Sequence, residues 1–402
     1  MTERWRALWV LSAARVAMGF QFQAIGATAP LLREQWGLGL AEIGWLVGLF
    51  LLPGALLALP GGLLSARFGD RRIAIAGTAL MVAGAALCAF AGDLETLKAG
   101  RLLGGIGGVL FNVTASKMVA DWFAGREIEL AMAIFVNTWP IGIGLGLLVL
   151  GPVAVAASPS MAFALTGALA LVSLLLVFGL YRPAPGAAAN GALTLSALAR
   201  GDGLRLFLSA AAWTTYNVAF VLMVGFLPTF FALRGLPVSE ASAITSTLSV
   251  TLAFSIPAAG LLIARFGRPW FIAVAGLAGW AVCLIALQLG APPMACLGAA
   301  GVLAGSAAGV LVAAPARFLS PAARAIGLGL FYTMFYIGMG VLPRLVGMLA
   351  DALGAPDVVL LATIGLVLAT IALLAGTRWA MPAMPAPPVA PVPDSAPGGS
   401  GR

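Results

Sequence analysis

The sequence has no histidine, few cysteines and very few charged residues. Its 402 residues include no His and three Cys, and Asp, Glu, Lys and Arg together make up 9%. The lack of His excludes histidine-based acid–base catalysis, histidine metal sites and histidine proton relays. Cys88, Cys283 and Cys296 lie in apolar runs, at spacings that suit neither a metal site nor a disulfide framework. Since no nucleophile–base pair or phosphate-binding loop is present either, the sequence predicts a protein that is not an enzyme and needs no cofactor.

The scarcity of charge also excludes an ordinary soluble fold. Soluble domains carry about 25% charged residues, whereas this chain is 61% hydrophobic. A lipid bilayer as the surrounding solvent accommodates such a composition. The formal net charge is +8, but the Lys and Arg residues stand in short segments between apolar runs. Membrane topology therefore explains the positive charge, and we expect contact with the lipid bilayer and none with nucleic acid.

Apolar runs that are long enough to cross a bilayer recur from one end of the sequence to the other. A helix crosses the hydrocarbon core, about 30 Å thick, in about 20 residues. The sequence therefore predicts an all-α membrane protein with twelve transmembrane helices. The predicted spans cover residues 8–32, 41–65, 73–92, 97–119, 130–153, 161–181, 206–231, 241–264, 270–289, 294–316, 325–349 and 358–376.

The distribution of positive residues predicts the orientation of these spans. Twelve spans place both termini on the same side of the membrane. Sixteen of the 22 Lys and Arg residues fall in segments on that side, three in segments on the other side, and three within spans. Because Lys and Arg gather in cytoplasmic loops, we expect a multi-pass protein of the inner (plasma) membrane with both termini in the cytoplasm.

The two halves of the sequence match each other at an offset of 198 residues. The run Gly-Leu-Leu-Ser-Ala-Arg-Phe-Gly at 62–69 meets Gly-Leu-Leu-Ile-Ala-Arg-Phe-Gly at 260–267, and Pro30 meets Pro228. Such matches keep their order through loops, which chance similarity of apolar segments does not explain. We predict two pseudo-symmetric six-helix bundles, a cytoplasmic linker and a disordered cytoplasmic tail. The bundles cover residues 1–181 and 204–377, the linker 182–203 and the tail 378–402.

The first of these loops carries a family resemblance. It reads Gly62-Leu-Leu-Ser-Ala-Arg-Phe-Gly-Asp-Arg-Arg72 and resembles the signature Gly-x-x-x-Asp-Arg-x-Gly-Arg-Arg of the major facilitator superfamily. In span four, Arg101-x-x-Gly104-Gly105 resembles the Arg-x-x-Gln-Gly pattern of that family. The stretch 48–62 and Asp121-Trp-Phe are similar to its cyanate-permease-like and nitrate/nitrite-porter-like branches. The resemblance implies a secondary transporter that works by alternating access between two six-helix halves.

The resemblance also points to residues that gate the conformational change. In the family, the Asp of the signature forms a charge interaction between helices that latches one conformation. Ala66 and Ala264 stand in its place here, so the resemblance does not carry that latch over to this chain. Gly62 permits close packing and Gly69 permits a tight turn. We expect gating at Gly62, Arg67, Gly69, Asp70, Arg71, Arg101, Gly260, Arg265, Gly267 and Arg344.

The charges embedded in the predicted spans are all arginines, because all fourteen acids lie in loops, tails or span ends. Arg15 lies about 10 Å into span one at 1.5 Å per residue, where it touches substrate or an inner gate, or snorkels to the headgroups. Arg101 gates or snorkels to the outer leaflet, and Arg344 contacts substrate or pairs with Asp351. A buried arginine suits an anion, whereas a cation would require a carboxylate partner.

Polar and aromatic residues in the middle of the spans complete the candidate site. Each one, taken alone, could instead hydrogen-bond to a neighbouring helix, because a buried amide or hydroxyl needs a partner. As a group they are expected to line a cleft between the halves. The predicted substrate-binding residues are Arg15, Gln21, Gln23, Asn112, Asn137, Trp213, Tyr216, Asn217, Tyr332 and Tyr336.

Three functions remain open at this point. The first is a monomeric transporter of a small anionic solute, by exchange or uniport, since no buried carboxylate or histidine is available to carry a proton. The second is an exporter of neutral or amphipathic compounds, which an apolar and aromatic cleft permits. The third is a sensor or assembly factor that has a transporter fold and does not transport.

Overall fold

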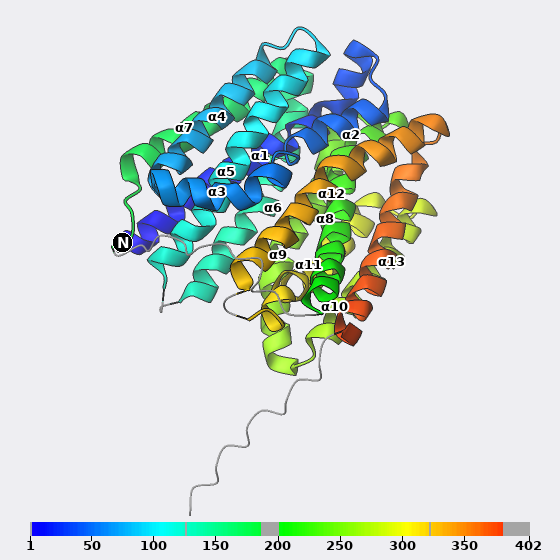
Figure 1. The fold of residues 1–402 in the computed structure, drawn as a ribbon. Coiled ribbons are helices and arrows are strands. Elements are labelled where there is room, and N and C mark those ends of the chain that lie inside the picture. The colour runs from blue at the N-terminus through cyan, green and yellow to red at the C-terminus, as the bar shows by residue number, and fades with distance from the viewer. Residues whose placement is uncertain (1, 125–126, 186–200, 321–322, 381–402) are drawn as a thin grey trace, which may run out of the picture.

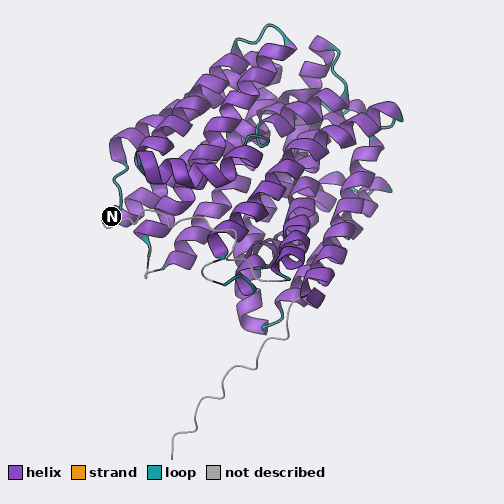
Figure 2. Ribbon diagram, in the orientation of Figure 1, coloured by secondary structure: helices purple, strands orange, loops and turns teal. Residues whose placement is uncertain are grey.

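The chain folds into a bundle of long helices. The computed structural model describes residues 2–124, 127–185, 201–320 and 323–380, and these contain no strand (Figure 2). Twelve helical segments of the described chain are long and apolar enough to cross a membrane. The predicted fold class, an all-α membrane protein with twelve spans, is therefore confirmed.

Six spans come from the first half of the chain, and one of them consists of two helices. The helices are α1 (Glu3–Trp36), α2 (Leu40–Leu49), α3 (Gly54–Phe68), α4 (Asp70–Ala89), α5 (Leu94–Trp122), α6 (Ile128–Ala156) and α7 (Pro159–Leu180). Six more spans and one short 3₁₀ helix come from the second half. They are α8 (Asp202–Leu233), α9 (Val238–Phe266), α10 (Pro269–Gln288), α11 (Pro293–Ala313), η2 (Pro315–Arg317), α12 (Arg324–Ala352) and α13 (Asp357–Ala380).

Figure 1 shows α1–α7, coloured blue to green, beside α8–α13, coloured green to red. We call these two groups the N-terminal half and the C-terminal half. Within the first, α1 packs against α6 and α7, and α4 packs against α5 and α7. Within the second, α8 packs against α13, and α11 packs against α9 and α10. An even number of spans puts the start of α1 and the end of α13 on the same side, which we call the terminal side.

The two halves meet along two main pairs of helices. In one pair α2 packs against α12, and in the other α6 packs against α9. Span two corresponds to span eight in the sequence repeat, and span five corresponds to span eleven. The two pairs are therefore equivalent contacts, which is the arrangement expected when a central site lies between repeats.

The second span differs from its prediction, because the structure divides it. A single helix was expected over residues 41–65, but α2 ends at Leu49 and α3 begins at Gly54. The backbone N–H groups of Leu51 and Leu52 both bond to the carbonyl of Gly48, at 2.9 Å each. Pro53 has no N–H to continue the helix, and its ring disfavours helical geometry in the residue before it. The Leu-Leu-Pro-Gly run was the signal for this interruption.

The ends of other spans also differ from the predicted ones by a few residues, as in α1 and α13. Helix α1 is longer at both ends than the predicted span 8–32, and it ends at Gly37, whose φ is 65°. Helix α13 continues to Ala380, past the predicted start of the tail at residue 378. The rest of the predicted tail, 381–402, and residues 186–200 of the predicted linker lie outside the described residues.

Candidate functional site

Arg15 places a positive charge between the two halves. Its guanidinium carbon lies 4.5 Å from the centroid of the Phe135 ring, which comes from α6. On the other side it lies within electrostatic range of Tyr332 and Tyr336, both on α12. The Nε atom of Arg15 is buried and has no hydrogen-bond partner among the described residues. A buried and unpaired donor favours contact with a ligand over snorkelling to the headgroups.

Asn112 and Tyr336 connect the halves beside this arginine. The Nδ2 atom of Asn112 donates to the phenol oxygen of Tyr336 across 3.3 Å, while its Oδ1 atom is buried without a partner. Tyr336 is only 4% exposed, and its ring lies against Gly54 so closely that a Cβ atom there would overlap the ring. The interruption of span two thus brings a backbone, with no side chain, against the ring of Tyr336.

Trp213 and the aromatic residues of α12 form the C-terminal wall of the site. The Trp213 ring stacks with Tyr216 at 5.8 Å and with Phe331 at 6.4 Å between centroids. Phe335 lies 6.1 Å from Trp213 and 5.0 Å from Tyr336, so the rings form a continuous cluster. The indole Nε1 atom is buried without a hydrogen-bond partner among the described residues. Because the ring faces are stacked, the N–H edge is the polar group that this wall offers.

Besides Tyr216, which stacks on Trp213 and also bonds to a backbone carbonyl, five of the ten predicted residues come together, and both halves contribute to the group. They are Arg15 and Asn112 from the N-terminal half, and Trp213, Tyr332 and Tyr336 from the C-terminal half. The guanidinium, indole, amide and phenol groups are all hydrogen-bond donors, and no carboxylate of the described chain is paired with Arg15. Among the described residues, no cluster of His, Cys, Asp or Glu could hold a metal ion. The arrangement can bind an acceptor-rich and negatively charged group.

The other five predicted residues donate to backbone carbonyls. Four of these bonds reach a neighbouring helix, as the alternative interpretation proposed, whereas the bond of Asn217 stays within α8. Gln23 and Asn137 do so across the junction of the halves, whereas the other three bonds stay within one half. The bonds are Gln21 Nε2 to Met81 O (2.9 Å), Gln23 Nε2 to Val224 O (2.6 Å), Asn137 Nδ2 to Ala253 O (2.7 Å), Tyr216 Oη to Ala304 O (3.2 Å) and Asn217 Nδ2 to Trp213 O (2.8 Å). Their place in substrate binding stays a prediction.

Arg101 lies inside the N-terminal half and is 2% exposed, which excludes snorkelling to the outer leaflet. Its guanidinium donates to the carbonyls of Leu46, Gln21 and Phe22 at 3.0, 3.0 and 3.1 Å. The guanidinium carbon also lies 4.7 Å from the centroid of the Phe50 ring. Leu46 is in the last turn of α2, where carbonyls lack a following helical turn. Arg101 thus ties the interruption of span two to α1, and its gating role stays a prediction.

The side opposite the termini is closed by contacts between α2 and α12. A Cβ atom on Gly48 would clash with the carbonyl of Gly340, so the two backbones touch there. Asp351 accepts hydrogen bonds from the backbone N–H groups of Leu40 (2.9 Å) and Ala41 (2.8 Å). It therefore caps α2 and does not form the ion pair with Arg344 that the sequence allowed.

Arg344 itself lies over the ring of Trp45, with its guanidinium carbon 4.7 Å from the ring centroid. Trp45 belongs to α2, so this contact also joins the two halves near the end of the spans. Glu42 accepts a hydrogen bond from the backbone N–H of Gly39 at the start of α2. A substrate contact of Arg344 and its gating role stay predictions.

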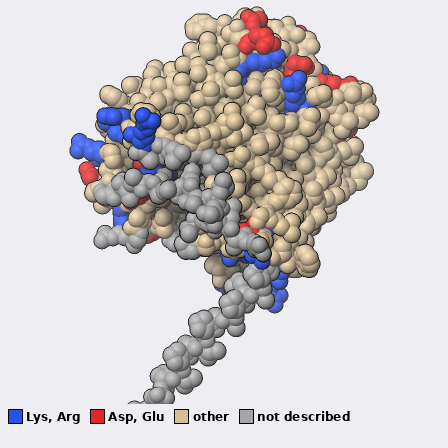
Figure 3. All heavy atoms as spheres, viewed as in Figure 1, with Lys and Arg blue, Asp and Glu red and all other residues tan. Residues whose placement is uncertain are grey.

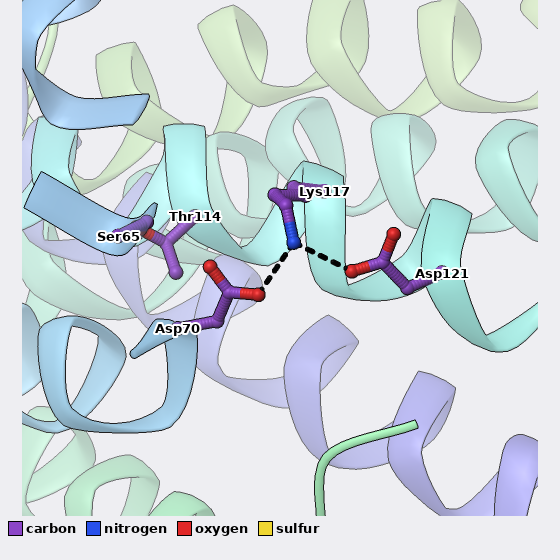
Figure 4. A network of polar contacts seen from close by, with 5 residues as sticks. All are labelled: Ser65, Asp70, Thr114, Lys117 and Asp121. Carbon is purple, nitrogen blue, oxygen red and sulfur yellow. Dashed lines mark hydrogen bonds and ion pairs between the residues drawn. The ribbon is translucent and has the colours of Figure 1, made fainter. Parts of the chain in front are cut away.

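A charged cluster lies at the terminal end of the N-terminal half (Figure 4). The ammonium of Lys117 lies 2.7 Å from a carboxylate oxygen of Asp70 and 2.7 Å from one of Asp121. Beside it, the hydroxyls of Ser65 and Thr114 share a 2.8 Å hydrogen bond between α3 and α5. Asp70, four residues after Ala66, thus supplies a carboxylate to this cluster. The pairing of Lys117 with Asp121 was not predicted from the sequence, although their i, i+4 spacing was the available signal.

The two signature loops are held in different ways. Gly69 has a φ of 89° and Gly267 a φ of 64°, so both turns need the freedom of glycine. The guanidinium of Arg71 donates to the carbonyl of Phe178 at 2.5 Å. A Cβ atom on Gly260 would meet no neighbouring atom, so close packing does not explain that glycine. The side-chain surroundings of Gly62 lie outside the described part of the chain. Arg67 and Arg265 are exposed beside Phe68 and Phe266.

Comparison with known proteins places this fold in a family. The family model of the Major Facilitator Superfamily matches residues 11–238, which is more than half of the chain. The chain belongs to this superfamily. In addition, the crystal structure of a bacterial homologue of the human lysosomal transporter Spinster, in an inward-facing and occupied conformation, shares its fold. The TM-score is 0.73 at 17% identity, over 93% of this chain and 96% of that one.

The curated relatives match a smaller share of the chain than this structure does. The human choline/ethanolamine transporter FLVCR2 is 28% identical over 239 residues, which are 55% of this chain and 44% of that protein. The Thermus thermophilus protein named "Probable nitrate/nitrite antiporter NarK1" is 25% identical over 282 residues, 66% of this chain and 62% of that one. The matched region thus spans less than two thirds of either relative. The family and these names agree with the prediction of a transport protein and not an enzyme.

Proposed function

We propose that this protein is a secondary transporter that exchanges small monovalent anions by alternating access between its two halves. The observation that carries the proposal is the placement of Arg15. Its unpaired Nε donor is buried between the halves, and the phenols of Tyr332 and Tyr336 face it from the other half. One cation without a nearby acid matches one negative charge.

The chemistry of the site favours a small planar oxyanion. A guanidinium presents its N–H donors in a plane, so that two of them can bond to two oxygens of one planar anion. The indole N–H of Trp213 and the phenol groups add neutral donors, and the surrounding apolar rings favour an ion of low charge, which loses its hydration at a smaller cost. The printed name of one relative, a nitrate/nitrite antiporter, supports this class of substrate.

Exchange follows from the charge of the empty site. With no carboxylate to pair with Arg15, the empty protein would have to carry an uncompensated positive charge through its conformational change. Burial of an unpaired charge is costly, and a bound anion removes that cost. The loaded protein should therefore change conformation faster than the empty one. A proton-coupled cycle is disfavoured, since the described acids lie at the ends of the spans.

The contacts between the halves support rocking of one half against the other. The contacts of α2 with Gly340 and Asp351 of α12 close the side opposite the termini. Release on that side would require these contacts to separate. We further propose that the protein acts as a monomer in the inner membrane with its terminal side in the cytoplasm. The excess of Lys and Arg in segments on the terminal side supports this orientation.

A second candidate is transport of a quaternary or primary ammonium compound. The aromatic cluster around Trp213 favours it, because aromatic faces attract cations, and one relative is named a choline/ethanolamine transporter. The stacking of Trp213 on Tyr216 and Phe331 counts against it, since these ring faces are already covered. Arg15 would in addition repel a cation bound beside Tyr336.

Flux in proteoliposomes separates the two candidates. Vesicles loaded with nitrate would be diluted into buffer with or without nitrite, and released nitrate measured by ion chromatography; parallel vesicles would carry labelled choline. We expect nitrate release that is accelerated by external nitrite, no choline flux, and loss of the nitrate exchange in Arg15→Gln. Arg6→Gln, on the same helix but paired with Glu3 at 3.4 Å, is the matched control. Choline flux that persists in Arg15→Gln would overturn the proposal in favour of the second candidate.

A further inference from the structure

Two arginines share one indole ring at the terminal end of the C-terminal half. The guanidinium carbon of Arg317, in η2, lies 5.1 Å from the centroid of the Trp270 ring, and that of Arg378, in α13, lies 5.8 Å from it. Trp270 is in the first turn of α10. Three elements that are distant in sequence thus bring two positive charges to one aromatic side chain. The charges can be no farther apart than the sum of these two distances.

Neither of these guanidinium groups has a carboxylate partner among the described residues. Partial burial lowers the pKa of Arg317, with no acid to oppose that effect. At a separation of at most about 11 Å, comparable with the Debye length of about 8–10 Å at 0.1–0.15 M salt, two like charges still repel each other in part. A cation–π contact of each guanidinium to one shared ring offsets only part of the repulsion. The pair therefore lacks a counter-anion.

The rest of this region is basic as well. Arg205, Arg265 and Arg268 stand at the terminal ends of α8, α9 and α10, and Asp202 is the acid described there, paired with Arg205 at 3.6 Å. The other acids described in this half lie at the opposite ends of their helices. Figure 3 shows Lys and Arg atoms at the end of the molecule next to α10 and α13. We call Trp270, Arg317 and Arg378, with the adjoining Arg268, the basic rim.

At the corresponding end of the N-terminal half, several of the cations are paired with acids. Arg4 lies 3.0 Å from Glu127, and Lys117 is held by Asp70 and Asp121. The general excess of positive residues on this side explains the sign of the charge in both halves. It does not explain why Arg317 and Arg378 converge on one ring with no acid beside them among the described residues.

The basic rim lies beside apolar groups of the kind that face lipid. Trp379 is 86% exposed and Phe271 is 70% exposed, next to Arg378 and Trp270 in sequence. Trp379 also lines a hollow of ≈ 300 Å³, together with Leu204 and Arg205. Tryptophan and arginine at the end of a span are typical of the level of the lipid headgroups. A phosphate at this level would have guanidinium groups as partners and acyl chains beside exposed rings.

We propose that the basic rim is a binding site for the phosphate group of an anionic phospholipid. Arg317 and Arg378 bond to the phosphate oxygens, which neutralises the two charges on Trp270. Arg268 and the free N–H groups in the first turn of α10 add to the positive field at the same place. The lipid bridges η2, α10 and α13, and so fastens the terminal end of the C-terminal half.

Native mass spectrometry of the purified full-length protein tests the site. The probes are dioleoylphosphatidylglycerol and dioleoylphosphatidylcholine, titrated separately into the same detergent. We expect wild-type protein to retain one phosphatidylglycerol in preference to phosphatidylcholine. The double variant Arg317→Gln/Arg378→Gln should bind phosphatidylglycerol at least about tenfold more weakly, because each charge-assisted hydrogen bond contributes roughly 1.5–3 kcal/mol. Each single variant should show part of that loss, which guards against a double variant that fails to fold.

Arg67→Gln is the matched control, since Arg67 is exposed on the terminal side of the other half and lies near one ring, 5.4 Å from the centroid of Phe68. It should bind phosphatidylglycerol like the wild type. Equal losses in Arg67→Gln and the double variant would overturn the proposal, because binding would then follow total charge. No preference over phosphatidylcholine would also overturn it. If inorganic phosphate displaces phosphatidylglycerol at equal concentration, the site takes a free anion and the lipid assignment is wrong.

Discussion

The amide of Asn112 donates a 3.3 Å hydrogen bond to the phenol of Tyr336, and this bond joins the two halves of the molecule beside Arg15. It is a contact that a substrate can replace. The phenol can donate to an anion held by Arg15, and the unpaired Oδ1 atom of Asn112 shows that the amide is not fully satisfied. Binding and movement of the halves would then act on the same pair of side chains.

Removal of this bond should alter the site without unfolding the protein. We expect Tyr336→Phe and Asn112→Leu each to lower thermal stability by about 1 kcal/mol, the usual net contribution of such a bond. In a double-mutant cycle, the double variant should cost less than the sum of the single variants. The measurement is unfolding in mixed micelles, together with nitrate exchange in proteoliposomes.

Tyr332→Phe serves as the comparison for this cycle, because no hydrogen bond joins Tyr332 to Asn112 in the structure. Its stability effect should add to that of Asn112→Leu with no coupling. If the cycle with Tyr336 is also additive, the hydrogen bond between Asn112 and Tyr336 does not contribute to stability.

The close approach of Gly48 to Gly340 should hold the side opposite the termini shut. An added methyl group at Gly48 meets a backbone carbonyl, which cannot move like a flexible side chain. We expect Gly48→Ala to cost about 1–3 kcal/mol in the closed state and so to raise the open population by at least about fivefold. Spin labels at Ala41 and Met348, in a background without the three cysteines, would report the change as longer distances.

Gly298→Ala is the matched control for that experiment, because a Cβ atom there meets no neighbouring atom. Its distance distribution should equal that of the parent protein. Unchanged distances in Gly48→Ala would show that the α2–α12 contact is not the closing element.

Arg101 should be one of the main stabilising side chains of the N-terminal half. Its replacement by Leu leaves the carbonyl of Leu46, in the last turn of α2, without its donor. We expect a loss of stability on the order of 3 kcal/mol, since a buried group left unpaired costs roughly 1–3 kcal/mol. The stability of Arg101→Lys should lie between those of the wild type and Arg101→Leu, because an ammonium cannot reach three carbonyls in the geometry of a guanidinium.

Unfolding by SDS in mixed micelles measures both Arg101 variants. Arg234→Gln shows how much stability a surface ion pair contributes. Arg234 pairs with Asp357 at 2.5 Å, and its side chain is 44% exposed. Its loss should stay below about 1 kcal/mol. An Arg101→Leu protein as stable as Arg234→Gln would contradict the account of the interruption in span two.

The stability of the cluster formed by Lys117, Asp70 and Asp121 should depend on the balance between its one cation and two acids. Lys117→Met leaves Asp70 and Asp121 facing each other without a counter-charge, so we expect a lower thermal midpoint. The second substitution Asp121→Asn should restore part of the loss, because it removes the repulsion between the two carboxylates. If Lys117→Met/Asp121→Asn is no more stable than Lys117→Met, charge balance is not what holds this cluster.

The sequence predicted the twelve spans, the repeat and the absence of embedded acids, because length, composition and period record these directly. It did not predict the interruption of span two, since Leu51–Gly54 is as apolar as its surroundings and the break depends on local backbone bonding at Pro53. The partners of Arg101 were also beyond sequence reasoning. Three backbone carbonyls from two helices have no signature in side-chain identity.

The candidate site was predicted only in part, because the sequence does not show which neighbouring groups a polar side chain contacts. Arg15, Asn112, Trp213, Tyr332 and Tyr336 were recognised as polar or aromatic residues in mid-span, and the structure brings them together. Gln21 and Asn137 had the same pattern but donate to backbone carbonyls. Which of two neighbouring helices an amide faces depends on tertiary packing, and a span that is apolar on all sides gives no periodic signal for it.

The most direct test of the central claim, that Arg15 binds a small anion between the halves, is thermal unfolding of the purified protein with added nitrate, nitrite or choline. A ligand that binds the folded state alone stabilises it by about 2.7 kcal/mol at a hundredfold excess over its dissociation constant. We predict that nitrate and nitrite raise the midpoint, that choline does not, and that Arg15→Gln abolishes the shift while Arg6→Gln keeps it. A shift with choline alone, or an anion shift that survives in Arg15→Gln, would contradict the account.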